Sequence, residues 1–316
     1  KLAEASQILS ELFFGDAFEE DKFELERKII LNELAEVEDD PSVKVEEMLM
    51  ASLFKKHPIR RPVGGYSRTV KQLTLNQIKQ AQLANYVPQN MILTLSGNLP
   101  HQTLEQALLG FQNQPAAETL AESKYSAEKS KPKACVIEEK SGIRQTYISI
   151  GARTVCSTHK DAPALDLIGT LLSGGTSSRL FIELREKNAV TYDVGSAHCK
   201  GADFGYFSVN CAVNNSKVEK ARKLILRELA SLGSEAVGRD ELERTKQIWL
   251  GSLLRGMDSI HDTLEIITYM EIQFKGENAL RDYVAKIKAI TKEDIQETAA
   301  RYLNENCLCT AILNPK

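Results

Sequence analysis

This sequence lacks long apolar runs and a large net charge of either sign. No apolar stretch approaches the roughly 18 residues that a transmembrane helix requires, and the polar start at Lys1 is not typical of a signal peptide. The 40 Lys and Arg residues are balanced by 43 Asp and Glu, so there is no broad basic excess of the kind that binds nucleic acid. We therefore expect neither a membrane span nor a nucleic-acid partner.

Complete metal-binding and nucleophile motifs are missing as well. The six cysteines contain no Cys-x-x-Cys, and the five histidines contain neither His-Glu-x-x-His nor His-x-x-Glu-His. No Gly-x-Ser-x-Gly or Cys/His signature marks a nucleophile. A chain of this size does not need disulfides, so we expect reduced thiols and a reducing, cytoplasmic compartment.

The sequence does contain an internal repeat. Residues 24–27 (Glu-Leu-Glu-Arg) recur at 241–244 and Thr74 recurs as Thr291, with a shared offset of 217 positions (241 minus 24, 291 minus 74). Each threonine opens a polar helical stretch. The 316 residues are about twice a typical domain length. The sequence therefore predicts two copies of one domain.

Both copies are expected to be α+β, with a mixed or antiparallel sheet on which helices pack. Residues 1–111 form the first domain, residues 112–134 a Gln-, Pro- and Ala-rich linker, and residues 135–316 the second domain. In the first domain, residues 91–97 predict a buried strand that ends at a glycine. Helices of the first copy are expected at residues 3–13, 19–38, 42–56, 74–86 and 102–111.

The repeat also predicts that the first copy is incomplete. The second copy starts near Cys135, so the offset places the start of the first copy about 80 or more residues ahead of Lys1. We therefore expect the first domain to lack its N-terminal part.

Two carboxylates of the first copy could take part in metal binding. Glu26 and Glu33 are seven residues apart, two turns along one predicted helix and on the same side. A carboxylate on a rigid helix can bind a divalent metal, and a second can orient the first ligands. On spacing alone a solvated acidic face is the more frequent explanation. The repeat distinguishes the two residues: Glu26 has a counterpart in the second copy, Glu243, whereas the position that corresponds to Glu33 is Leu250.

A second pair lies in the second copy. Arg185 comes near a predicted helix end, and Tyr192 follows seven residues later at the entry to a strand. A guanidinium and a phenol in one cleft could bind a peptide carbonyl and stabilise an oxyanion. The alternative is a surface arginine beside a half-buried strand tyrosine. The preceding loop, residues 173–178, lacks the Gly-Lys-Ser/Thr ending of a phosphate-binding loop and is expected to be a tight turn.

Taken together, these residues resemble the pitrilysin-like zinc metallopeptidases, specifically the mitochondrial processing peptidase type and its prokaryotic relatives. The order and spacing of several blocks carry the resemblance over nearly the whole chain. These blocks are residues 23–33, His57-Pro58, residues 62–65, residues 86–91, residues 173–181 and the run from Leu184 to Tyr192.

The resemblance implies duplicated α+β domains around a peptide-binding chamber, with zinc as the cofactor. It implies a His-x-x-Glu-His motif, which this sequence does not contain, in which two histidines bind zinc and the glutamate acts as general base. By position, Glu33 resembles the third zinc ligand and Glu26 its supporting carboxylate. Arg185 and Tyr192 resemble the family's arginine–tyrosine pair, which holds substrate and stabilises the transition state.

The expected function is a zinc-dependent endopeptidase that hydrolyses extended or unfolded peptides, with peptide or protein as substrate. A homodimer or a paired subunit of the same family is the expected assembly. The alternatives are a non-catalytic partner subunit or a structural scaffold. Because a catalytic zinc site needs three protein ligands and only Glu33 is found, the chain alone is not expected to bind zinc tightly or to be active.

Overall fold

The computed structural model describes residues 2–15, 18–98, 100–108, 110–111, 125, 128 and 134–316. Apart from three residues, the predicted linker at 112–134 lies outside this description. Within the described residues, no helix combines the length and the apolar character needed to cross a membrane.

The chain forms two compact units. Unit 1 contains residues 1–36, 64–124 and 257–272, and unit 2 contains residues 37–63, 125–256 and 273–316. Residues 37–63 therefore belong to unit 2 although the residues on both sides of them belong to unit 1. Residues 257–272 belong to unit 1 although the residues on both sides of them belong to unit 2. The division into two sequence copies at 112–134 stays a prediction.

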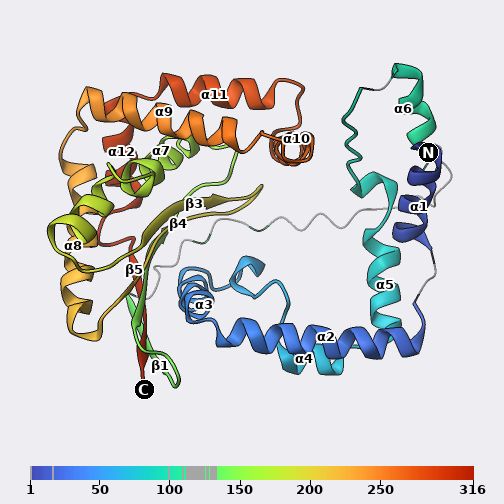
Figure 1. Cartoon of the computed structure of the whole chain (residues 1–316), viewed down its shortest axis with the longest axis horizontal. Coiled ribbons are helices and arrows are strands. Elements are labelled where there is room, and N and C mark those ends of the chain that lie inside the picture. Colours follow the sequence, from blue (N-terminus) through green and yellow to red (C-terminus); the bar gives the residue numbers. More distant parts are fainter. Residues whose placement is uncertain are drawn as a thin grey trace. The chain divides into compact units, whose positions relative to one another are not determined.

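Unit 2 is built on one five-stranded mixed sheet in the order β1-β5-β2-β4-β3 (Figure 1). β5 pairs with β1 in parallel, and the other neighbouring strands are antiparallel. The strands are β1 (Cys135–Lys140), β2 (Thr146–Arg153), β3 (Val194–Lys200), β4 (Gly205–Val213) and β5 (Cys309–Pro315). Together with the helices that cover it, this sheet confirms the predicted α+β class.

Helices cover both faces of the sheet (Figure 1). On one face lie α7 (Ala162–Ser173), α8 (Val218–Ser234) and α12 (Lys292–Tyr302), and α3 (Pro41–Leu53) packs on the other. The alternation of side chains along β5 explains this. Cys309, Ala311 and Leu313 share the face against α3 and form one buried cluster with its apolar side chains.

One of the remaining helices of unit 2 has an unusual geometry. The helix predicted to end near Arg185 is a π-helix, η3 (Phe181–Lys187). The other elements are α9 (Arg239–Arg255), α11 (Ala279–Ala289), η1 (Pro58–Arg60) and η4 (Asn215–Lys217). A further helix, α10 (Ile260–Phe274), runs through residues of both units.

The regular elements among the described residues of unit 1 are all helices. Besides most of α10, they are α1 (Leu2–Phe14), α2 (Glu20–Asp39, whose last turn belongs to unit 2), α4 (Ser67–Gln72), α5 (Leu75–Asn85), η2 (Pro88–Asn90) and α6 (His101–Leu108). The helix that Thr74 opens, α5, begins with a capping box, because Thr74 Oγ1 accepts from Gln77 N and Gln77 Oε1 accepts from Thr74 N. Its repeat counterpart, Thr291 with Asp294, forms the same box on α12.

Polar contacts hold much of unit 1 together. The hydroxyl groups of Ser6 and Ser10 are buried and donate to the carbonyl oxygens of Ala107 and Gly110, which joins α1 to the α6 segment. Arg27 on α2 donates to the carbonyl oxygens of Val70 and Leu73 at 2.6 and 2.8 Å. No residue of α2 is buried. Unit 1 therefore has much less apolar core than unit 2.

The predicted buried strand at residues 91–97 is wrong. The segment is not part of a strand ladder with any described residue, and Ile92, Leu93 and Leu95 are exposed. Its apolar side chains are those of a strand, but a strand is buried only when neighbouring strands satisfy its backbone groups and cover its faces.

Candidate functional site

Arg185 and Tyr192 lie together in unit 2. The guanidinium carbon of Arg185 stands 4.1 Å from the centre of the Tyr192 ring and 4.8 Å from that of Phe181. The arginine is thus held between two aromatic rings, an arrangement that cation–π attraction stabilises. Tyr192 is 80% exposed, so its hydroxyl reaches solvent. The two predicted site residues of this copy are therefore brought into contact.

The backbone between the two residues is fixed by local contacts. Arg185 lies on the π-helix η3, a rare geometry that is frequent at functional sites. Ala189 then takes a left-handed conformation (φ 46°), which lets Val190 N donate to Leu184 O at 2.7 Å. The buried hydroxyl of Thr191 donates to Ala212 O at 2.7 Å, which ties the loop to β4. These contacts fix the loop that places Tyr192 next to Arg185.

The N–H groups of the Arg185 guanidinium form no hydrogen bond that the structure records with another described residue. No carboxylate or carbonyl among the described residues forms a hydrogen bond or an ion pair with its guanidinium. A stacked guanidinium donates in the plane of its nitrogens, at right angles to the direction of stacking. The stack can therefore present N–H donors to a carbonyl or carboxylate oxygen of a bound peptide.

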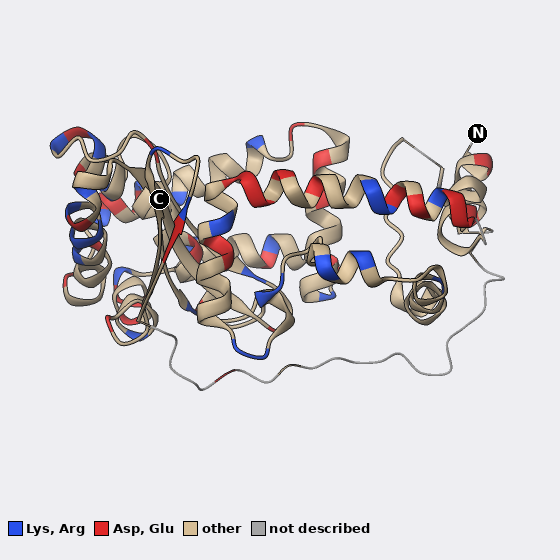
Figure 2. Ribbon diagram, turned by 90° about the horizontal axis from the view of Figure 1, so that it is seen from below, with Lys and Arg blue, Asp and Glu red and all other residues tan. Residues whose placement is uncertain are grey.

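Glu26 and Glu33 both lie on α2 in unit 1. Acidic positions recur along this helix (Figure 2). Both side chains are exposed, and neither forms a hydrogen bond or an ion pair with a described residue. Among the described residues there is no group of three His, Cys, Asp or Glu side chains that could hold a metal ion. The two carboxylates are available, but they do not form a metal site by themselves.

A polar pocket of about 470 Å³ in unit 2 was not anticipated. One of its lining residues is Asp166 on α7, whose Oδ1 accepts from His198 Nδ1 at 2.8 Å and whose Oδ2 accepts from Tyr283 OH at 2.6 Å. Lys200 Nζ donates to both carboxylate oxygens. His198 Nε2 lies 3.1 Å from Thr154 Oγ1, so the ring is bonded at both nitrogens.

The charges of this pocket are set by burial and by their partners. Burial alone would raise the pKa of Asp166, but the hydrogen bond from His198 and the charge of Lys200 hold that pKa below its usual range. Burial lowers the pKa of His198, although Asp166 opposes the effect. Asp166 is thus a carboxylate next to a neutral histidine and a lysine cation. Alternation along residues 194–200 places Ser196, His198 and Lys200 on one face, and this pattern was the available sequence signal.

One carboxylate from the predicted linker region is fixed to unit 2. Glu128 accepts hydrogen bonds from the backbone N–H groups of Lys55, Lys56 and His57 at 2.7 to 2.8 Å. Arg153 on β2 lies 3.4 Å away on its other side. Burial would raise the pKa of Glu128, but the three N–H donors and Arg153 lower that pKa to about 2. No local pattern could reveal this contact, because its partners are about 70 residues distant in the chain.

Comparison with known proteins adds three findings. A family model described as the peptidase M16 inactive domain matches residues 72–248. A protein of Mycobacterium leprae named an uncharacterized zinc protease is 27% identical over 301 residues, which cover 93% of this chain and 66% of that protein. The chain thus spans about two thirds of the length of this relative.

Solved structures share the fold. A protease from Helicobacter pylori superposes with a TM-score of 0.92 at 22% identity, over 99% of this chain and 76% of that one. A chain of complex III2 from Candida albicans superposes with a TM-score of 0.84 at 18% identity, over 99% of this chain and 76% of that one. The matched range 72–248 contains Arg185 and Tyr192, whereas Glu26 and Glu33 lie outside it.

Proposed function

Because this chain belongs to the peptidase M16 family, we propose that it supplies the substrate-holding part of a zinc-dependent endopeptidase that acts on extended peptides. The observation that carries the proposal is the preformed stack of Arg185 and Tyr192. Its open N–H edge and exposed phenol fit a peptide carbonyl, and fixed donors of this kind stabilise the oxyanion that forms when a peptide bond is attacked.

Extended peptides are the proposed substrate class because they expose the groups that such a site recognises. A peptide in this conformation presents its carbonyl oxygens at regular intervals and can add to a sheet edge through main-chain bonds. Tyr192 lies just before β3, and β3 is an edge strand of the unit 2 sheet. A peptide beside this edge would meet the arginine–tyrosine stack at the start of the strand.

Glu33 is proposed as one zinc ligand and Glu26 as the carboxylate that orients it. The described residues do not fit zinc on their own, since catalytic zinc sites use three protein ligands and no such group is present among these residues. Zinc chemistry therefore requires ligands beyond the described residues. What the chain's own residues do is bind and orient the peptide through Arg185 and Tyr192.

Peptide affinity tests this proposal directly. A fluorescein-labelled unstructured peptide is titrated with the 316-residue chain, and anisotropy gives the Kd. Arg185→Ala should weaken binding by about tenfold or more, because a charge-assisted hydrogen bond contributes about 1.5–3 kcal/mol. The matched control is Arg281→Ala, which removes an exposed arginine from α11 and should leave the Kd unchanged. Equal affinities for all three proteins would exclude a substrate-holding role of Arg185.

A second candidate function is a non-catalytic partner subunit, which would pair with a zinc-bearing chain of the same family or with a second copy of itself. Such a subunit would supply Arg185 and Tyr192 to a site whose zinc lies on the other chain, whereas Glu33 would have no role in it. Peptide hydrolysis distinguishes the two. If the chain cleaves the labelled peptide and a chelator stops the cleavage, the partner-subunit candidate is excluded.

A further inference from the structure

The two aromatic rings that contact Arg185 are held in different ways. The guanidinium carbon lies 4.8 Å from the centre of the Phe181 ring and 4.1 Å from that of the Tyr192 ring. Tyr192 is 80% exposed, so few contacts hold its side chain in place. Phe181 is less exposed and lies on η3, the same helix as Arg185. Phe181 is therefore the ring that the fold itself fixes next to the guanidinium.

The core of unit 2 determines where Phe181 and Arg185 project. Leu180 and Leu184 are completely buried, and each directly precedes one of the two residues. A helix with i→i+5 hydrogen bonds turns more slowly than an α-helix, so residues i and i+4 leave it on nearly the same side. The buried leucines thus fix one side of η3 in the core and place Phe181 and Arg185 together on the neighbouring side.

Polar contacts hold the same helix from the solvent side. Glu183 on η3 accepts hydrogen bonds from Arg227 of α8 at 2.5 Å and from Lys187 at 3.2 Å. Asn188 Nδ2 donates to the carbonyl oxygen of Glu183 at 2.8 Å, beside the end of the helix. None of these contacts involves Tyr192. The position of η3, and with it that of the Phe181 ring, is thus set independently of the tyrosine side chain.

The side chain of Tyr192 is free to turn although its backbone is fixed. The preceding residue, Thr191, donates to Ala212 O and so ties the backbone to β4. The exposed ring itself contacts Arg185 through a cation–π interaction, which is weak at exposed sites. A ligand that offers the phenol a hydrogen-bond partner can therefore draw the ring away from the guanidinium at little cost.

We propose that Phe181 is the positioning residue of the arginine–tyrosine pair, which keeps the Arg185 guanidinium in place while the Tyr192 ring turns towards a bound peptide. Phe181 acts through Arg185 and does not touch the peptide. This assignment rests on the proposed function, because it gives separate tasks to the two residues that hold the substrate. It adds a third residue to the site, one that neither the spacing nor the family resemblance indicated.

The mobility of the Arg185 side chain tests the positioning role without any peptide. Nitrogen-15 relaxation of its Nε–H group gives an order parameter for the guanidinium. Phe181→Leu should lower this order parameter towards that of the exposed Arg281, whereas Phe181→Tyr keeps a ring and should preserve the wild-type value. Tyr192→Ala should lower it much less. An unchanged order parameter in Phe181→Leu, or an equal decrease in Tyr192→Ala, overturns the proposal.

Peptide affinity shows whether Phe181 acts through Arg185. Phe181→Leu should raise the Kd of the labelled peptide about two- to fivefold, the effect of losing one exposed cation–π contact. In a chain that already carries Arg185→Ala the same substitution should leave the Kd unchanged. Equal effects in the two backgrounds would mean that Phe181 touches the peptide directly, which contradicts the positioning role. If Arg185→Ala alone leaves the Kd unchanged, the proposed function fails, whereas the order parameter still decides the role of Phe181.

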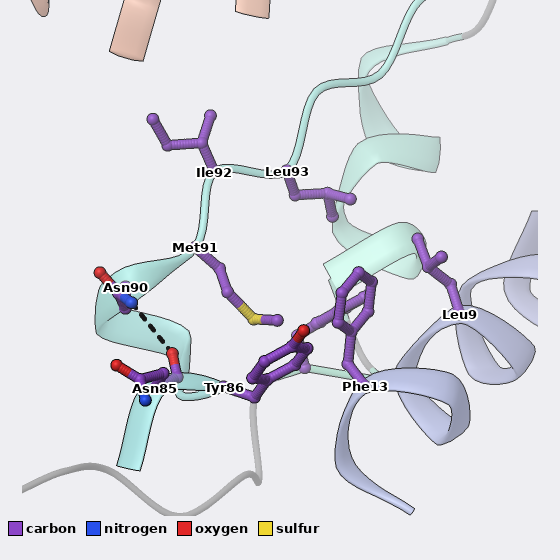
Figure 3. A pocket seen from close by; sticks show the side chains of 9 residues that line it. Leu9, Phe13, Asn85, Tyr86, Asn90, Met91, Ile92 and Leu93 are labelled. Carbon is purple, nitrogen blue, oxygen red and sulfur yellow. Dashed lines mark hydrogen bonds between the residues drawn. The ribbon is translucent and has the colours of Figure 1, made fainter. Parts of the chain in front are cut away.

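An apolar pocket of about 390 Å³ in unit 1 provides the matched control. Phe13 is partly exposed, as Phe181 is, and its ring lies 6.0 Å from that of Tyr86 on this pocket, which no described arginine lines (Figure 3). Phe13→Leu should therefore change neither the order parameter of Arg185 nor the Kd. A Kd that rises as much for Phe13→Leu as for Phe181→Leu would contradict the proposal.

Discussion

Glu128 gives the sharpest prediction about stability. Glu128→Gln keeps the size of the side chain but removes the charge that three backbone N–H groups and Arg153 stabilise. Folding lowers the pKa of Glu128 from 4.5 to about 2, and each pKa unit corresponds to about 1.4 kcal/mol. At neutral pH the substitution should therefore lower the free energy of unfolding of unit 2 by about 1.5–3 kcal/mol, the contribution of hydrogen bonds to a charged group.

The pH dependence has a definite sign. Because the folded-state pKa is the lower one, the contribution of Glu128 is fully present above about pH 5 and decreases as the pH falls towards 2. The difference between wild type and Glu128→Gln should thus shrink to roughly half or less at pH 3. The sequence has one tryptophan, Trp249, and it lies in unit 2, so its fluorescence during urea unfolding reports on this unit alone.

A matched control isolates the contact. Glu138→Gln removes a half-exposed carboxylate that lies 3.8 Å from Lys44, and such surface pairs contribute about 0–1 kcal/mol. It should change the unfolding free energy far less than Glu128→Gln. If the two variants lose the same amount at pH 7, or if the loss for Glu128→Gln is the same at pH 7 and pH 3, the reasoning is refuted.

Two further predictions concern unit 2. Asp166→Asn should destabilise it by about 1.5–3 kcal/mol, because the charge-assisted hydrogen bonds that the Asp166 carboxylate accepts from Lys200 and His198 are lost or weakened. Adding Lys200→Met should recover part of the loss, and no recovery in urea unfolding would contradict the assignment. Thr291→Ala should cost about 1 kcal/mol by removing the cap of α12, and thermal unfolding followed by Trp249 measures it. A loss well below that of a typical cap would show that the Asp294 half of the box is sufficient.

Much of the helical structure could be predicted because its signals are local. Thr74 and Thr291 each begin a helix through a capping box that is readable within four residues. The family resemblance, drawn from blocks such as residues 173–181, is confirmed by the match over residues 72–248. The prediction of a buried strand at residues 91–97 was wrong because a strand is buried only by neighbouring strands and covering helices from other parts of the chain. No local sequence pattern contains that information.

The candidate site was predictable to different degrees. The family resemblance paired Arg185 with Tyr192, whereas their spacing alone also fitted a surface arginine beside a half-buried tyrosine. Their contact depends on a π-helix and on the left-handed conformation of Ala189, and no local sequence pattern predicts either. Asp166 and His198 are 32 residues apart and meet only through the packing of α7 on β3. The roles of Glu26 and Glu33 stay predictions, since both side chains are exposed and without a partner among the described residues.

The strand order of unit 2 constrains how the protein is made. β5 is the fifth strand along the chain, yet it is the one that joins β1 to β2. During synthesis β2, β3 and β4 can form an antiparallel three-stranded sheet with β4 in the middle, whereas β1 lacks its partner strand until about 170 further residues have been added. Because β5 is the described strand that pairs with β1, the place of β1 in the sheet is settled only after β5 has been made. Completion of this sheet is therefore a late event of synthesis.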